Sequence, residues 1–247
     1  PSITADSLDR LIENISYWDP GDIIMLTDDA TYIVSGTIDI YQEINVIGDP
    51  SLTNKPEIRF YDNGFRLKED TISVTFKNLR FNGLKADNIS RAGYILRFDQ
   101  NSWYNWKNIV IQNCEAYNYV GGLQLSKNIW CTYDSVIIDN VIWHDFTSHA
   151  IEPRRGATKY MAITNSTFYD IAGTFMQNPY FSDGTRDTVQ QQIVMNRNTF
   201  FKLVKGTNSF IQSNDPKDGS VHLTFTNNIV STLLDTANAR PFRIDPL

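Results

Sequence analysis

The segment ITNSTFY (163–169) consists of a short apolar strand, an Asn, and a second short strand that carries an aromatic residue. The pattern recurs along the chain in FKNLRF (76–81), IQNCEAY (111–117), IDNVIWH (138–144), NRNTFF (196–201) and FTNNIV (225–230). From Asn78 to Asn228, these repeats are on average 30 residues apart. Self-similarity at a period of about 20–50 residues is typical of solenoids and propellers.

A solenoid explains this repeat better than a propeller does. Propeller blades need hairpins closed by Asn-Gly or Asp-Gly turns, and these dipeptides are mostly missing from the chain. Asn tolerates the left-handed conformation that a sharp corner between two strands requires. Amides stacked on successive coils can also form hydrogen-bonded ladders. The corners are therefore predicted at Asn78, Asn113, Asn140, Asn165, Asn198 and Asn228.

The N-terminal segment predicts a cap for this solenoid. Leu8, Leu11, Ile12 and Ile15 have the spacing of one apolar helical face, and Pro20-Gly21 ends the pattern. A solenoid exposes its core at each end, so the helix is expected to cover the first coil. We therefore predict one all-β domain over residues 1–247, a right-handed parallel β-helix of about seven coils. Residues 1–20 form the capping helix and entry, and residues 21–247 form the coils.

Each coil should contain a third strand. The candidates are GFRLK (64–68), GYILRF (93–98), GGLQLS (121–126), HAIEPR (149–154), GTFMQN (173–178), NSFIQS (208–213) and RPFRID (240–245). Side chains alternate between the two faces of a strand, so the outward residues are Arg66, Arg97, Gln124, Glu152 and Arg243. In two coils the phase is open: either Met176 and Ile211, or Gln177 and Gln212 with their Phe neighbours, face solvent. A ligand groove and an ordinary polar exterior both fit this column.

Aromatic residues gather in the loops beside these strands. Trp103, Tyr104, Trp106 and Trp130 are the candidates for stacking on sugar rings, with Arg66, Arg97, Gln124 and Glu152 as polar binding residues. The alternative is that the aromatic side chains fold over the solenoid as additional core.

The order of segments resembles a known superfamily. A helix, then PGDIIML (20–26), INVIGDP (44–50) and PEIRF (56–60), followed by the repeated Asn coils, is similar to the pectate-lyase-like parallel β-helices. More narrowly, it resembles bacterial β-helix domains associated with polysaccharide utilisation. The resemblance covers the whole chain, and it implies that a polysaccharide lies along one sheet between flanking loops. It brings no complete catalytic signature of a lyase family.

The densest reactive segment is WHDFTSHAIEPRRGATKY (143–160). A lyase for uronic-acid polymers must neutralise the substrate carboxylate and remove the proton beside it. Arg suits carboxylates because it binds them with two hydrogen bonds, and a base needs a pKa near the working pH. We therefore expect Arg154, with Arg97, to bind carboxylates, and one of His149, Lys159 and Arg155 to act as the base.

Other roles in and around this segment stay open. Glu152 would orient these groups or help to hold a cation. A hydrolase would instead pair two carboxylates, for which Asp99 and Glu152 are candidates two coils apart. A charged loop held by salt bridges fits the segment equally well. His144 and His222 are expected to be structural.

Composition narrows the partners. The net charge of −6 argues against nucleic acid as a partner, and no apolar stretch approaches the ~20 residues needed to span a bilayer.

Cys114 and Cys131 are expected to be buried thiols, with one disulfide as the alternative. No metal or cofactor motif is found, and NDPKDG (214–219) lacks the spacing of a calcium loop; calcium remains the one cofactor to consider. The start of the chain lacks the positively charged residues and apolar run of a signal peptide, so any export signal is expected to have been removed already.

We therefore expect a monomeric, exported protein that acts at the cell surface, in the periplasm or outside the cell. Its partner is a polysaccharide or oligosaccharide, and its activity is that of a lyase for acidic polysaccharides. Two alternatives are a non-catalytic carbohydrate-binding solenoid and a structural or adhesive surface module.

Overall fold

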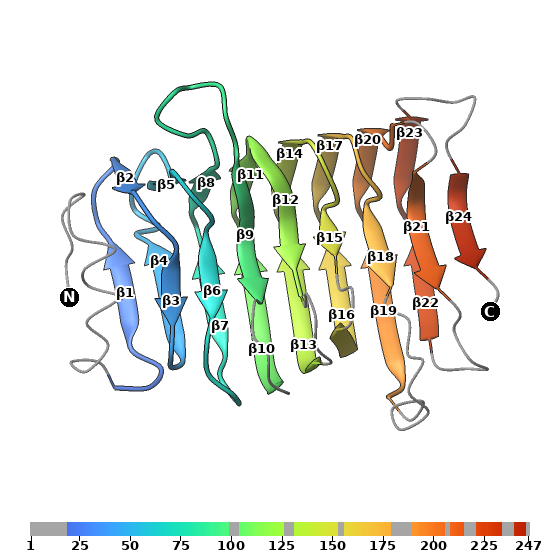
Figure 1. Cartoon of the computed structure of the whole chain (residues 1–247), viewed down its shortest axis with the longest axis horizontal. Coiled ribbons are helices and arrows are strands. Elements are labelled where there is room, and N and C mark those ends of the chain that lie inside the picture. The colour runs from blue at the N-terminus through green and yellow to red at the C-terminus, as the bar shows by residue number, and fades with distance from the viewer. Residues whose placement is uncertain are drawn as a thin grey trace.

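The computed structural model describes residues 19–98, 104–125, 131–152, 156–178, 189–205, 208–214, 221–233 and 240–245. These residues form a parallel β-helix whose coils stack from the N-terminal to the C-terminal end (Figure 1). Every coil contributes one strand to each of three parallel sheets. The predicted capping helix over residues 1–20 lies almost wholly outside the described residues, and no described element is a helix that could cross a membrane.

The first sheet contains β1 (Ile23–Leu26), β4 (Ile44–Gly48), β7 (Val74–Lys77), β10 (Tyr104–Gln112), β13 (Cys131–Asp139), β16 (Gly156–Thr164), β19 (Gln191–Asn196) and β22 (Val221–Thr226). The second contains β2 (Thr31–Val34), β5 (Glu57–Phe60), β8 (Arg80–Asn82), β11 (Glu115–Tyr117), β14 (Ile142–Phe146), β17 (Thr167–Ile171), β20 (Thr199–Leu203) and β23 (Ile229–Leu233). The third contains β3 (Ile38–Ile40), β6 (Phe65–Leu67), β9 (Ala92–Phe98), β12 (Tyr119–Gln124), β15 (Ile151–Glu152), β18 (Met176–Asn178), β21 (Ser209–Asn214) and β24 (Arg240–Asp245).

All seven segments expected to form the third strand of a coil overlap strands of the third sheet. The described part of each sheet has eight strands, where the sequence suggested about seven coils. Neither β1 to β3 nor β4 to β6 has one of the predicted Asn corners; the second of these coils was recognised from its third strand, and β1 to β3 is the additional coil.

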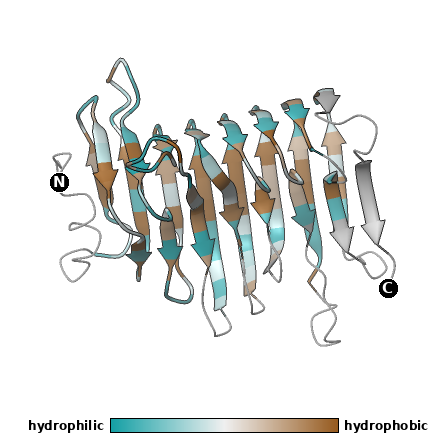
Figure 2. Ribbon diagram, turned by 45° about the horizontal axis from the view of Figure 1, so that its top comes forward, coloured by the Kyte–Doolittle hydropathy of each residue, from teal (hydrophilic) through white to brown (hydrophobic). Residues whose placement is uncertain are grey.

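The interior of the solenoid is filled by the inward residues of each strand. In β7, Val74 and Phe76 are buried while Thr75 and Lys77 are half-buried, and similar bands recur along the strands in Figure 2. Aromatic rings on successive coils stack inside, as Phe168 and Phe200 do with ring centroids 5.4 Å apart. Equivalent residues of successive coils stack directly above one another, so each apolar side chain packs against the equivalent side chain of the next coil.

The first corner of the coil lies between the first and second sheets. A left-handed Asn was predicted at this corner in six coils, and the prediction is correct in four of them. Asn78, Asn113, Asn140 and Asn165 all have a left-handed backbone, with φ between 52° and 55°. In the next two coils the left-handed residues are Arg197 and Asn227, each one position earlier than predicted. Asn198 follows its corner and points inward, where it is 1% exposed. Each of these corners contains two adjacent polar residues, Arg197-Asn198 and Asn227-Asn228, so the sequence did not show which of the two is at the corner.

The sequence left open which residues face solvent in two strands of the third sheet, and the structure shows why. Its strands carry two consecutive buried residues, such as Phe175 and Met176 in one coil and Phe210 and Ile211 in another. The second member of each pair continues the alternation. Gln177 and Gln212 are therefore the outward residues, and they pair with each other in register.

Both cysteines are buried and free, as expected. Burial raises the pKa of the Cys114 thiol to about 12, so this residue is protonated at neutral pH and serves as core.

Candidate functional site

The outward residues of the third sheet form one continuous line across the coils. Strand register places Asp39, Arg66, Arg97, Gln124 and Glu152 in the same row. Gln177 and Gln212 carry the row into later coils. We call this line the third-sheet polar row. The row predicted from the sequence therefore exists, and it begins one coil earlier than predicted, at Asp39.

Arg66 is already engaged within this row. Its Nε and Nη2 atoms donate to the two carboxylate oxygens of Asp39, at 2.5 and 2.7 Å. This two-point ion pair has the geometry that Arg would otherwise use for a substrate carboxylate. Arg66 is consequently a weaker candidate for substrate binding than the sequence suggested.

The centre of the row holds a buried carboxylate. Glu152 is 4% exposed, and Gln124 beside it is 5% exposed. The hydroxyl of Tyr94 donates a hydrogen bond to Oε2 of Glu152 at 2.7 Å. A polar group this deeply buried requires hydrogen-bond partners, and the Tyr94 hydroxyl is one such partner for Glu152.

Gly121 makes the contact between these two residues possible. Tyr94 lies two coils away from Glu152, and its backbone pairs with that of Gly121 on the intervening strand β12. A Cβ atom at Gly121 would lie 2.7 Å from Tyr94 Cε1 and 2.8 Å from the carbonyl oxygen of His149. Any side chain at this position would displace the Tyr94 ring. Sequence reasoning missed Tyr94, and its one signal was the glycine pair that starts GGLQLS (121–126).

His149 lies just before β15, on the same sheet. Its Nδ1 atom accepts a hydrogen bond from the backbone N–H of Thr174 at 2.9 Å. A backbone amide can only donate, so the neutral ring carries its proton on Nε2. In this state the lone pair of Nδ1 is engaged, and the ring can donate a hydrogen bond through Nε2; the base role expected from the sequence stays a prediction.

The other predicted catalytic residue that the structure describes is not brought to this face. Lys159 lies on β16 of the first sheet, where its ammonium contacts Oδ1 of Asp134 at 2.6 Å. Both of these side chains are more than half exposed. Arg154 and Arg155 lie outside the described residues.

Of the four predicted stacking residues, Trp103 and Trp130 also lie outside the described residues. Trp106 is a correction. Its side chain is 1% exposed, it stacks between Tyr104 and Tyr133, and its indole N–H donates to the carbonyl oxygen of Glu69 at 2.8 Å. Because alternation along β10 turns this ring inward, it offers no face to a sugar. Tyr104 is half-buried on β10 of the first sheet.

His144 lies on the second sheet, away from the polar row. Its ring is stacked between Tyr117 and Tyr169, with interplanar angles of 1° and 4°. Its two ring nitrogens face Glu115 and Asp145. The carboxylates of Glu57 and Glu115 also contact Arg80, so this part of the second sheet is a closed polar network. Burial and the neighbouring Asp145 raise the pKa of Tyr169 in this network.

Among the described residues, no group of three or more His, Cys, Asp or Glu side chains is arranged to hold a metal ion. The polar row alone therefore provides no complete set of acidic ligands for calcium. Its described groups include the Asp39–Arg66 ion pair, Arg97, Gln124 and the buried Glu152 with its hydrogen bond from Tyr94.

A solved structure of a known protein is similar to the fold described above. No curated protein matches the sequence. A PL6 family alginate lyase, AlyGC, has a similar structure, with a TM-score of 0.68 and 14% sequence identity. The match covers 93% of this chain but 39% of that enzyme. At this identity the similarity supports the parallel β-helix fold, and the chain spans about two fifths of the length of the lyase.

A family model described as "Domain of unknown function (DUF4957)" matches residues 30–171. This match spans more than half of the chain, from β2 to the end of β17, and includes the five residues from Asp39 to Glu152 of the polar row. The chain therefore belongs to the DUF4957 family.

Proposed function

We propose that this protein binds an acidic polysaccharide along the third-sheet polar row and cleaves it by β-elimination. The observation that carries the proposal is the buried Glu152 carboxylate, with Tyr94 bonded to it and Arg97 in the same row. A positive charge and a proton-transfer pair are groups that elimination from a uronic acid requires, and His149 adds a hydrogen-bond donor for the departing oxygen. Similarity to a polysaccharide lyase supports the choice of reaction class.

Each group has a role in the proposed reaction. The Arg97 guanidinium binds the uronate carboxylate and stabilises the negative charge that develops beside it. The oxygen of Tyr94 removes the proton from C5 of the sugar while Glu152 takes up the hydroxyl proton of Tyr94. The electron pair of the C5–H bond forms the C4–C5 double bond, and the C4–O bond breaks. The Nε2–H of His149 donates a hydrogen bond to the departing oxygen, which takes its proton from water, and the proton held by Glu152 then returns to the solvent.

A protein with this role would act where polymers are found, so we propose an extracellular, cell-surface or periplasmic location. The polymer lies across the coils, and a monomer suffices because the row is contained in one chain.

The test is a screen against alginate, polygalacturonate and glycosaminoglycans, following the ultraviolet absorbance of new unsaturated ends. Tyr94→Phe keeps the ring on Gly121 and removes only the hydroxyl. We expect turnover to fall by about 10²-fold or more with KM nearly unchanged, which is the usual range for loss of acid–base catalysis. Arg97→Met should raise KM and also lower turnover, because Arg97 binds the carboxylate and stabilises the charge that develops in the transition state.

Tyr160→Phe is the matched control, because Tyr160 is an exposed tyrosine on the first sheet. It should leave activity unchanged. Absence of any absorbance change with every polymer would refute the lyase.

A non-catalytic glycan-binding solenoid is the second candidate, and the Asp39–Arg66 ion pair favours it, because that arginine is not available to a substrate carboxylate. In that case the wild type binds the polymer without cleaving it. Tyr94→Phe then binds as tightly as the wild type.

A further inference from the structure

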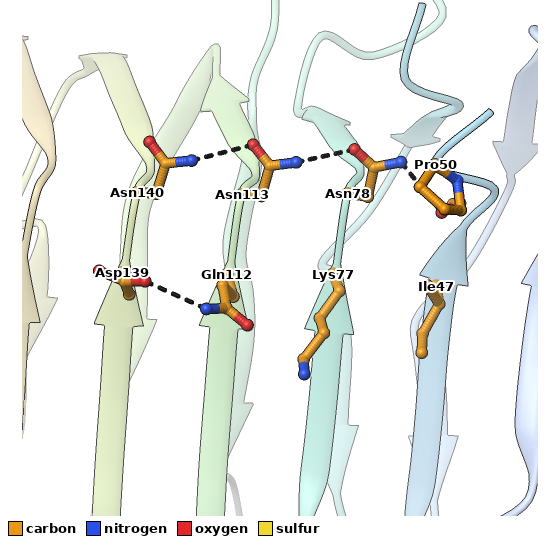
Figure 3. Close-up of a pocket in the computed structure, with 9 residues that line it drawn as sticks. Ile47, Pro50, Lys77, Asn78, Gln112, Asn113, Asp139 and Asn140 are labelled. Atoms are coloured by element: carbon orange, nitrogen blue, oxygen red, sulfur yellow. Dashed lines mark hydrogen bonds between the residues drawn. The ribbon is translucent and has the colours of Figure 1, made fainter. Parts of the chain in front are cut away.

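A second polar surface lies at the first corner of the coil, away from the third-sheet polar row. A cavity of about 420 Å³ opens there across four coils, between Ile47 and Pro50 at one end and Asp139 and Asn140 at the other. Figure 3 shows two rows of side chains in it. One row is the amide ladder Asn78, Asn113 and Asn140, and the other contains Lys77, Gln112 and Asp139.

The amide ladder is held in place by its own hydrogen bonds. The Nδ2 atom of Asn140 donates to Oδ1 of Asn113 at 3.2 Å, and Nδ2 of Asn113 donates to Oδ1 of Asn78 at 2.9 Å. Asn78 in turn donates to the carbonyl oxygen of Gly48 at 3.0 Å. With neighbouring strands ~4.8 Å apart, the three amides span ~10 Å in a fixed orientation.

These bonds leave hydrogen-bonding capacity unused. A primary amide has two N–H groups and an oxygen with two lone pairs. Within the part of the chain that the structure describes, each of the three amides uses one N–H. Asn78 and Asn140 also keep acceptor capacity, whereas Asn113 accepts from both Asn140 and Lys55. Hydroxyl groups, which donate and accept, complement such a row.

The second row carries separated charges. Asp139, at one end, accepts three hydrogen bonds, from Gln112, Thr164 and Asn165. Lys77, two coils away, is half-buried, and no described residue accepts a hydrogen bond from its ammonium. A ligand carboxylate placed at Lys77 would supply that acceptor. Ile47 and Pro50 beside it provide an apolar surface for the C–H face of a sugar.

We propose that this corner is a second binding site for an acidic oligosaccharide, separate from the third-sheet row. The uronate carboxylate binds Lys77, the hydroxyls bind the free N–H groups of the ladder, and one sugar ring packs on Ile47 and Pro50. The inference takes its ligand class from the proposed function but depends on different residues. It makes the protein a bivalent binder of one polymer, which raises retention on long chains.

The test is a titration of the ¹⁵N-labelled protein with alginate and polygalacturonate tetrasaccharides, following the side-chain amide signals of the ladder asparagines. We expect saturable shifts of the Asn78, Asn113 and Asn140 signals. Lys77→Met keeps the length of the side chain and should weaken this binding about tenfold, as loss of one charge-assisted hydrogen bond predicts. Lys107→Met removes an exposed lysine elsewhere on the first sheet and should have no effect.

Arg97→Met separates the two proposals. If the ladder signals still shift in this variant, or in a wild type without lyase activity, the corner site stands independently of the polar row. No ladder shift at saturating tetrasaccharide overturns the inference. So does an equal loss of binding in Lys77→Met and Lys107→Met, because this would show a general charge effect.

Discussion

Two polar ladders run along the same corner of the solenoid, one residue apart in the coil. The outer ladder, Asn78, Asn113 and Asn140, faces the cavity and solvent. The inner ladder, Ser166, Asn198 and Asn228, occupies in later coils the inward position that Leu79, Cys114 and Val141 fill in earlier ones. A shift of one position thus moves an Asn from the surface into the core.

The two ladders therefore differ in whether water can replace the hydrogen-bond partners of each amide. Asn198 donates to the carbonyl oxygen of Ile163 and to Oδ1 of Asn228, and it accepts from the backbone N–H of Ser166. Water cannot replace these bonds at 1% exposure. Water can replace those of the outer ladder, so the same residue type carries different energetic weight at the two positions.

The largest effect is therefore expected from Asn198→Ala. It leaves the Ser166 amide and the Ile163 carbonyl without their partner inside the core and creates a small cavity. We expect the free energy of unfolding to fall by about 3 kcal/mol, measured by chemical denaturation. A loss below about 1 kcal/mol would show that water enters the core and substitutes for the amide.

Asn113→Ala should have a smaller effect, about 1–2 kcal/mol. It removes hydrogen bonds that are exposed or only partly buried, and it places Ala at φ 53°, which costs a non-glycine residue about 1 kcal/mol. Asn113→Gly removes the same amide but tolerates positive φ, so its loss should be smaller by about that amount. Equal losses in the two variants would assign the whole effect to the ladder rather than to the backbone.

The smallest effect concerns acid stability at the end of the outer ladder. Burial raises the pKa of Asp139, but hydrogen bonds from Thr164, Asn165 and Gln112 outweigh it, and the pKa is lowered overall. A lowered folded pKa means that Asp139 stabilises the fold above its unfolded pKa, about 3.9. This contribution is lost as the pH falls through the folded pKa.

Asp139→Asn should accordingly differ most from the wild type at neutral pH, and the difference should shrink as the pH falls below about 4. Denaturation midpoints measured from neutral to acidic pH give this comparison. A difference that stays constant with pH would mean that the charge of Asp139 contributes nothing.

Much of the candidate site could be predicted from single segments. The positions of Arg97, Gln124 and Glu152 on one outer row follow from alternation within each third strand and from the stacking of like segments. Tyr94 could not be placed in this way. Its contact joins two coils separated by a third, and it depends on the absence of a side chain at Gly121.

Trp106, in contrast to Tyr94, was predicted as a site residue and is buried in the core. A cluster of aromatic residues in the sequence suggested an exposed surface, but β10 extends from Tyr104 to Gln112 and continues its alternation through the cluster. Only the extent of the strand decides which ring turns inward, and this depends on pairing with β13.

The sequence by itself determined the parallel solenoid, its three strands per coil and the chemistry of its corners. These features are local, because side-chain alternation and left-handed tolerance act within a few residues, and the repeat multiplies them. The tertiary structure alone decided which members of each row bond to one another. Coils joined by connections of unequal length acquire their register only when the strands pair. That register brings Tyr94 to Glu152 and places Lys77 in its cavity with no hydrogen-bond acceptor among the described residues.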